Sequence, residues 1–232
     1  MSEQRNHGPT TYKTVGSLPR VIPLFPLSGA LLLPRVHFPL NVFEQRYLAM
    51  VDDALAGDRL IGMIQPRTSE FDDHTPEIYQ VGCAGRLTQF SETNDGRYGI
   101  VLTGICRFTV QSELDVTTPY RQAAVSWAEH MDDIVPPVED AAIDREGITN
   151  SLDSYFAKFG KQPDISSLDN APAESLVNSL ASICPFGLEE KQALLEAANL
   201  TARAEILSGL IQMAIAEDRG AKDGSPEKHT LQ

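Results

Sequence analysis

The stretch "FPLNVFEQRYLAMVDDAL", residues 38–55, is the most informative segment for predicting the fold of the first half of the chain. It passes from an extended, proline-containing run into a helical pattern. Asn41 is a favourable N-cap, and Glu44 three residues later completes a capping-box arrangement. The sequence therefore predicts a helix from about residue 42 to residue 56, ended by Gly57. Its apolar face comprises Phe43, Tyr47, Met50, Val51 and Ala54.

We refer to Phe43, Glu44, Arg46 and Tyr47 as the corner residues. Glu44 and Arg46 are two positions apart, roughly 200° around a helix, so the pattern predicts no ion pair between them. We expect Glu44 to face the positive end of the helix dipole, and Arg46 to bind a neighbouring strand or loop. Phe43 and Tyr47 are predicted core residues. The corner is thus predicted to be architectural rather than catalytic.

The composition limits the classes of protein to which the chain can belong. With 232 residues, 42% of them hydrophobic, the chain can bury the core of one large domain or two smaller units. Its net charge is -13, from 19 Lys and Arg against 32 Asp and Glu, which disfavours nucleic acid and anionic membranes as partners. Residues 1–15 lack the apolar core of a secretory signal, and the apolar run 21–34 is too short to span a bilayer. Three widely spaced cysteines fit neither a disulfide framework nor a metal site, so we expect a cytoplasmic protein.

The first half of the chain is predicted to be rich in strands. Asp95-Gly96 is a strong hairpin signal. With a single helix among six or seven strands, the pattern favours a closed or strongly curled sheet over βαβ units. The principal strand segments are 20–27, 59–66, 81–90, 97–104, 106–114 and 121–130.

The second half is predicted to be helical, which gives an α+β fold with a curled sheet or barrel followed by a helical bundle. Four helices are expected, with apolar faces at 148–159 and 176–183, a third over 188–199, and a fourth capped by Thr201. The predicted division is a flexible tail 1–17, a β-rich subdomain 18–130, an acidic linker 131–142, a helical subdomain 143–219 and a flexible tail 220–232.

Catalytic motifs are not found in the sequence. Its Gly160-Lys161 pair lacks the remainder of a P-loop, and neither a Gly-x-Ser-x-Gly elbow nor a His-Glu-x-x-His helix occurs. None of the five histidines is paired at metal-ligand spacing. Cys83 and Cys106 fall in predicted strands, where a free cysteine usually behaves as a small apolar residue. We therefore predict no catalytic, cofactor-binding or metal-binding residues.

The opening of the chain resembles the N-terminal, substrate-binding domain of Lon ATP-dependent proteases. "IPLFPLSGALLLP" and "FPLNVFEQRYLAMV" are similar to that family's first strand and its Pro-Leu-x-Val-Phe-Glu-x-Arg-Tyr segment, and the similarity extends over about residues 18–215. The resemblance implies a PUA-like β-subdomain followed by helices. The resemblance does not extend to the ATPase and Ser-Lys peptidase domains of Lon proteases. The tail motif Asp223–Pro226 has its serine and proline in the reverse order to the family's Asp-Gly-Pro-Ser stretch around the catalytic serine. We expect a stand-alone, non-enzymatic module.

The leading hypothesis is recognition of unfolded polypeptide or of a protein partner, in cooperation with a separate ATP-dependent protease as one option. The corner residues are the matched family positions, with a structural role favoured over a binding role. One alternative is a small hydrolase that uses a carboxylate or one of the thiols of Cys83, Cys106 and Cys184. The other is RNA binding, because PUA-like folds can bind RNA, although the net charge opposes it.

Overall fold

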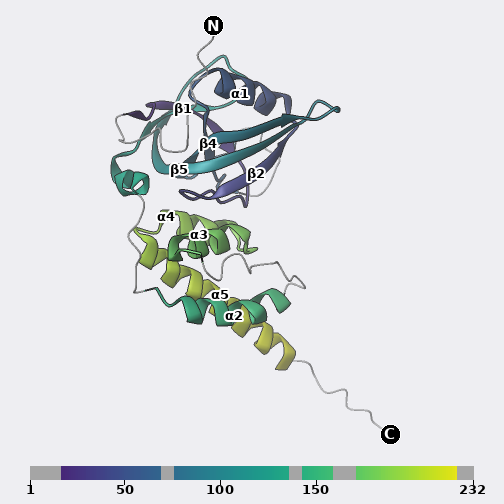
Figure 1. Ribbon diagram of the computed structural model, residues 1–232, viewed down its shortest axis with the longest axis vertical. Helices are drawn as coiled ribbons and strands as arrows, with labels where there is room; N and C mark the ends of the chain where they lie inside the picture. The colour runs from purple at the N-terminus through teal and green to yellow at the C-terminus, as the bar shows by residue number, and fades with distance from the viewer. Residues whose placement is uncertain (1–16, 69–75, 136–142, 159–170, 224–232) are drawn as a thin grey trace. The chain divides into compact units, whose positions relative to one another are not determined.

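The computed structural model contains two compact units along one chain (Figure 1). The β-rich unit consists of Met1–Val138 with Ser182–Glu196, and the helical unit of Glu139–Ala181 with Ala197–Gln232. The predicted division differs, because it assigns residues 182–196 to the helical part. The residues whose structure is described are 17–68, 76–135, 143–158 and 171–223.

Six strands form one sheet that closes on itself. The strand order is β2-β5-β4-β3-β1-β6, and an additional pairing of β5 with β6 completes a ring. All pairs are antiparallel except β1 with β3. The predicted curled sheet followed by helices is confirmed. The strands are β1 Val21–Pro26, β2 His37–Val42, β3 Leu60–Ile64, β4 Val81–Glu92, β5 Tyr98–Glu113 and β6 Gln122–Ser126.

Strand β5 replaces the two strands predicted at 97–104 and 106–114. The chain stays extended through Gly104, where a β-carbon would collide with the carbonyl group of Leu33. Next to it, the register shifts between the pairs Gly85–Gly104 and Ala84–Cys106, which leaves one extra residue on β5. The bulge bends the strand, so its first half can pair with β2 and its last residues with β6.

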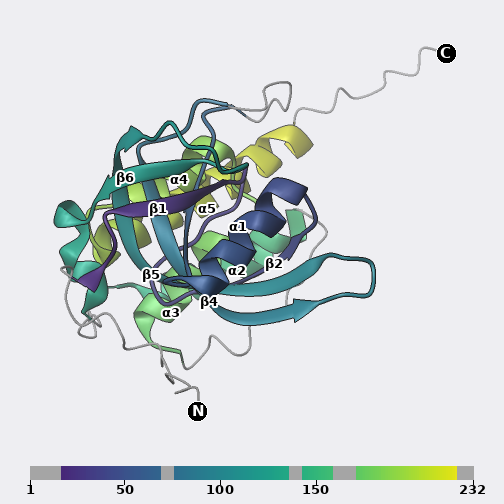
Figure 2. The ribbon, with the colours of Figure 1, turned by 90° about the horizontal axis from the view of Figure 1, so that it is seen from above.

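The β4–β5 hairpin forms where the sequence predicts it. Its turn is closed by the hydrogen bond from Thr93 N to Arg97 O at 2.9 Å, and Gly96 has a φ of +77° that favours glycine. Figure 2 shows the tip of this hairpin projecting beyond the rest of the β-rich unit.

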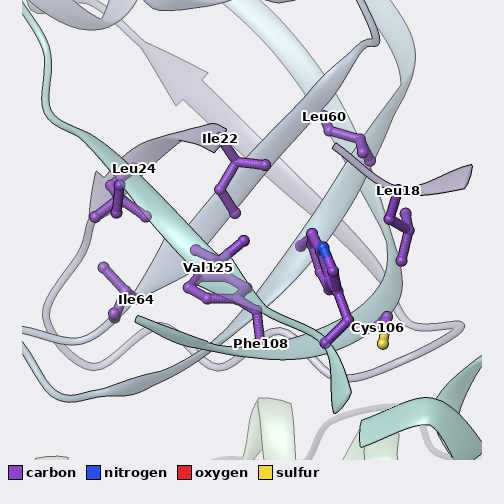
Figure 3. Packing of buried hydrophobic residues seen from close by; sticks show 11 residues of the cluster. Leu18, Ile22, Leu24, Leu60, Ile64, Cys106, Phe108 and Val125 are labelled. Atoms are coloured by element: carbon purple, nitrogen blue, oxygen red, sulfur yellow. The ribbon is translucent and has the colours of Figure 1, made fainter. Parts of the chain in front are cut away.

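The core of the β-rich unit lies inside the ring. Figure 3 shows Ile22, Leu24, Phe108 and Val125 pointing toward one another from β1, β5 and β6. The ring of Phe108 packs edge-on against that of Trp127, with centroids 6.0 Å apart. A β-carbon at Gly62 or Gly82 would contact the Phe108 ring at 3.0 Å or closer, so these positions need glycine.

Helix α1, Gln45–Ala56, begins three residues later than predicted. Asn41 and Val42 pair with β5 as the end of β2, so the predicted Asn41 cap is wrong. Glu44 takes the N-cap position with an extended backbone and makes no side-chain capping bond. The sheet pairing satisfies the backbone groups that a longer helix would have used. The helix ends at Gly57, as predicted.

Two segments outside the strands complete the β-rich unit. The 3₁₀ segment η2, Ala128–Ile134, occupies the start of the predicted linker, and α4, Leu188–Glu196, packs on the ring. From α4, the buried Lys191 donates to Gly29 O at 2.5 Å, and Gln192 donates to Val81 O at 3.1 Å. Burial lowers the pKa of Lys191. Polar bonds therefore fix α4 to strand β4 and to the connection between β1 and β2.

A buried ion pair joins β5, η2 and α4. Arg107 donates to both carboxylate oxygens of Asp133, from Nε at 2.9 Å and from its second terminal nitrogen at 3.0 Å. Its backbone N–H also donates to Asp133, and its remaining terminal nitrogen donates to Leu195 O at 3.0 Å. The two charged side chains are only 6% and 10% exposed. The acidic residue predicted to lie in a linker is thus a structural anchor.

The helical unit contains α2 Arg145–Lys158, α5 Leu200–Asp223 and all of α3, Ala173–Ile183, except its last two residues. Hydrogen bonds between its helices include those from the buried Arg203 to Asn178 at 2.9 Å and from Gln212 to Ser151 at 2.9 Å. The N-cap of α5 is Asn199, which accepts from Ala202 N at 2.9 Å, so the predicted cap at Thr201 is wrong. The predicted face of α2 is confirmed at Ile148, Leu152, Tyr155 and Phe156, while Phe159 falls outside the described residues.

Helix α5 continues to Asp223, so the tail predicted from residue 220 begins inside this helix. Most of the predicted N-terminal tail, the rest of the linker and residues 224–232 fall outside the described residues. Among the helices that the structure describes, none has the length and apolar character needed to cross a membrane.

Replacing Arg107 with leucine should lower the free energy of unfolding of the β-rich unit by about 3–5 kcal/mol, because the Asp133 carboxylate would stay buried without its cation. Urea unfolding followed by the fluorescence of Trp127, the single tryptophan, measures this directly. Arg97→Ala is the control, since it removes an ion pair to Asp95 whose side chains are 60% and 58% exposed. Equal unfolding midpoints for the two variants would contradict the anchoring role.

Candidate functional site

A pocket of about 470 Å³ opens in the β-rich unit, and all four corner residues line it. It lies where β1 ends, where β2 runs into α1, and where the connection between β5 and β6 passes. Figure 2 marks β1, β2 and α1. We call it the corner pocket. The structure therefore brings together Phe43, Glu44, Arg46 and Tyr47, the positions that the sequence singles out.

The lining of the corner pocket is largely apolar and stiff. The rings of Phe25 and Tyr47 contact each other with centroids 4.4 Å apart and planes inclined by 41°. Proline has a fixed φ and few conformations to lose on binding, so a pocket walled by prolines is largely formed before a ligand arrives. The lining prolines are Pro26, Pro66, Pro76 and Pro119.

Phe43 does not lie in the core, as the sequence predicts, but is 63% exposed at the pocket. The helical pattern placed it on the face of Tyr47, yet α1 begins only at Gln45. Phe43 therefore precedes the helix and does not follow its periodicity. Tyr47 lies inside the helix and is buried, as predicted, and this burial raises the pKa of its phenol.

One wall carries an ion pair that the sequence analysis excluded. Arg46 donates from Nε to Glu44 Oε2 at 2.9 Å, and a terminal nitrogen of Arg46 lies 2.8 Å from the same oxygen. The prediction is wrong because it placed both residues on a helix, whereas Glu44 has extended φ and ψ of -73° and 133°. The guanidinium group of Arg46 also lies over the Tyr47 ring, 4.6 Å from its centroid.

A second wall comes from a distant part of the chain, which the sequence analysis missed. Arg121 donates to both carboxylate oxygens of Glu113 at 2.7 and 2.6 Å, and its other terminal nitrogen donates to Pro76 O at 2.8 Å. The residues between these partners, including Leu114 and Asp115, also line the pocket. No local pattern marks this segment, because closure of the ring between β5 and β6 brings it to the corner.

Tyr120 fastens this second wall to helix α1. Its hydroxyl donates to Asp53 Oδ2 at 2.6 Å, and its ring is buried. Burial, together with the hydrogen bond to the Asp53 carboxylate, raises the pKa of Tyr120 to about 12. The phenol therefore remains a donor at neutral pH.

The cysteines lie away from the corner pocket. Cys83, Cys106 and Cys184 are all buried, and none lines the pocket. Burial raises the pKa of Cys106 to about 12, and its thiol lies 3.2 Å from the carbonyl oxygen of His130. Burial, assisted by Arg107, lowers the pKa of the His130 imidazole. Cys106 is thus a protonated core thiol rather than an activated nucleophile.

The histidines and carboxylates that the structure describes form no group that could hold a metal ion. The ring of His37 makes a 2.8 Å hydrogen bond to the hydroxyl of Thr103 on the neighbouring strand. His7, His74 and His229 fall outside the described residues.

Comparison with known proteins identifies the family to which this chain belongs. Residues 21–213 match the ATP-dependent protease La (LON) substrate-binding domain, and the chain belongs to this family. The resemblance seen in the sequence is confirmed. The chain is 27% identical over 206 residues to Lon protease 2 of Myxococcus xanthus, with 84% of this chain and 24% of that protein covered. It is also 27% identical over 214 residues to the Lon protease of Anaeromyxobacter dehalogenans, covering 88% and 24%. The chain thus spans about a quarter of the length of these relatives.

Solved structures agree with the family assignment. A Lon N-terminal domain protein from Xanthomonas campestris is 26% identical, with a TM-score of 0.57 over 82% of this chain and 97% of that one. The N-terminal domain of the Mycobacterium avium complex Lon protease has a TM-score of 0.58 over 83% of this chain and 98% of that one. Its identity is 14%, so this second likeness concerns the fold alone.

The folded protein should not react with a chromogenic disulfide reagent at about pH 8, because its thiols are buried and the thiolate is the reactive form. After unfolding in urea, all three cysteines should react. Absorbance of the released reagent counts them. A thiol that reacts rapidly in the folded protein would instead support the cysteine-hydrolase alternative.

The Tyr120 hydroxyl should make stability depend on alkaline pH. Its pKa in the folded protein, about 12, exceeds the ordinary value of 10.0 for a tyrosine, so its contribution is complete below about pH 10 and is lost as the pH rises through about 12. Tyr120→Phe should therefore be less stable than the unmodified protein at neutral pH, and this difference should shrink over that range. Chemical unfolding at several pH values measures it. Tyr79→Phe, which removes a phenol outside the pocket lining, is the control, and a pH-independent difference would contradict the assignment.

Proposed function

We propose that this protein binds extended or unfolded segments of polypeptide in the corner pocket, without catalysis. The observation that carries the proposal is the 63% exposed ring of Phe43 beside an apolar pocket of about 470 Å³. Membership of a substrate-binding family supports it. An exposed aromatic ring gains free energy when an apolar partner covers it, and the volume is in the range of ligand-binding pockets.

The stiff lining favours binding of side chains. The pocket walls contain prolines, and both of their arginines are already held by carboxylates, so little conformational freedom is lost when a side chain enters. Addition of a peptide strand to the sheet is less suitable at this corner. The nearby edge strand β2 contains Pro39, which has no N–H to donate to an added strand. Recognition by apolar side chains therefore suits the geometry best.

The two alternatives find little support at this pocket. A cysteine hydrolase would need a thiol there, yet the three cysteines are buried elsewhere. Glu44 and Glu113 are each engaged by an arginine, which leaves neither as a free general base. RNA binding would need unpaired cations, but both arginines of the pocket are paired with carboxylates.

Cooperation with a separate ATP-dependent protease is part of the proposal. The matched relatives are Lon proteases about four times longer than the region that aligns with this chain. A chain that binds polypeptide without unfolding or cutting it would need a partner for either step. In this view the protein selects a client and the partner processes it.

The test is fluorescence anisotropy of a labelled, permanently unfolded protein titrated with this chain in the absence of ATP. Saturable binding is expected, and Phe43→Ser should raise the dissociation constant about thirtyfold, because truncation of a central aromatic contact costs about 2 kcal/mol. Phe90→Ser is the matched control, since Phe90 is 41% exposed on β4 but does not line the pocket.

A folded, labelled protein serves as the second control and should not bind. If Phe43→Ser and Phe90→Ser bound the unfolded probe equally well, the corner pocket would not be the site. If the unmodified chain bound neither probe, general recognition of unfolded polypeptide would be excluded.

A further inference from the structure

The charges around the corner pocket are unequal in number. Its charged lining residues are three carboxylates and two guanidinium groups. Two of the carboxylates are neutralised by the arginines in the pairs already described, which leaves one negative charge in excess. The five residues are Glu44, Arg46, Glu113, Asp115 and Arg121.

The two ion pairs also present their negative ends to solvent. The side chain of Glu44 is 45% exposed against 35% for Arg46, and that of Glu113 is 41% exposed against 19% for Arg121. The arginines are held back by contacts within the protein. Arg46 lies over the Tyr47 ring, and Arg121 donates to a backbone carbonyl group. An approaching ligand therefore meets carboxylate oxygens more readily than guanidinium groups.

Asp115 adds an unneutralised charge to this rim. It is exposed, lies between Glu113 and Tyr120 on the second wall, and makes no ion pair with the residues that the structure describes. The net charge of the whole chain, -13, strengthens the negative potential around the rim. An apolar pocket with such a rim matches a ligand that is apolar at one position and cationic beside it.

We propose that the corner pocket selects polypeptide segments in which an apolar side chain is flanked by lysine or arginine. The apolar side chain packs against Phe43 and the pocket lining. The flanking cations donate to the exposed carboxylates of Glu44, Glu113 and Asp115. Acidic flanks meet repulsion, because the two arginines already have carboxylate partners. This selectivity rests on the proposed function and adds a sequence preference to it.

The test compares three labelled, unstructured peptides of equal length with the same central phenylalanine. Their flanking positions carry lysine, serine or glutamate. Anisotropy at low ionic strength should give the order lysine, serine, glutamate from tightest to weakest, with about a tenfold difference between the extremes. The difference should shrink at high salt, since exposed charges are screened.

Two matched variants locate the preference. Asp115→Asn and Glu205→Gln change the net charge equally, but only Asp115 lines the pocket, while Glu205 is exposed on α5 in the helical unit. Asp115→Asn should reduce the ratio of lysine-peptide to glutamate-peptide affinity about threefold. Glu205→Gln should leave that ratio unchanged. An equal reduction by both variants would overturn the rim as the cause.

The outcomes separate this inference from the proposed function. If the serine-flanked peptide binds, Phe43→Ser weakens it, and lysine and glutamate flanks bind equally, the charge preference is wrong and the polypeptide site stands. Tighter binding of the glutamate peptide would also overturn the preference. If none of the three peptides and no unfolded protein binds, both the proposed function and the preference fall.

Discussion

The buried contact between Arg107 and Asp133 is the constraint on which the β-rich unit depends. Along β5, Cys106 and Phe108 belong to the core cluster inside the ring, and the residue between them must point the other way. That residue is Arg107, which binds η2 through Asp133 and α4 through Leu195 O. Strand β5 thus places Cys106 and Phe108 in the core on one face. On its other face, Arg107 binds two segments that are distant in the sequence. A buried charge is tolerated here because its donors are used in several directions at once.

Closure of the ring then creates the corner pocket. Strand β5 bends at its bulge, pairs first with β2 and finally with β6, and so brings Glu113 and the following connection to the pocket at the β2–α1 corner. The hydrogen bond from Tyr120 to Asp53 ties that connection to α1. The shape of the pocket follows from the fold and from its prolines rather than from a ligand. Such a preformed site can bind without the entropic cost of first ordering its walls.

The chemistry of the pocket is compatible with the proposed role in recognition. Its guanidinium groups have carboxylate partners, its most exposed apolar ring is Phe43, and the thiols of the chain lie in the core. These features agree with a family defined by substrate binding. Neighbouring residues of one motif also differ in environment: Tyr47 is a buried residue of α1, whereas Phe43 is exposed to solvent.

The family, the curled sheet, the hairpin at Asp95-Gly96 and the buried face of α1 could all be predicted from the sequence. These follow from local periodicity, turn chemistry and motifs, which a linear pattern records. The exposure of Phe43 and the ion pair between Glu44 and Arg46 could not be predicted and are seen only in the folded chain. Both depend on where β2 stops pairing with β5, and strand pairing is a long-range competition that the local pattern of residues 38–55 does not contain. Asp133 is likewise predicted to lie in an acidic linker, but in the folded chain it pairs with Arg107. The charge of a side chain does not reveal a partner that is distant in the sequence.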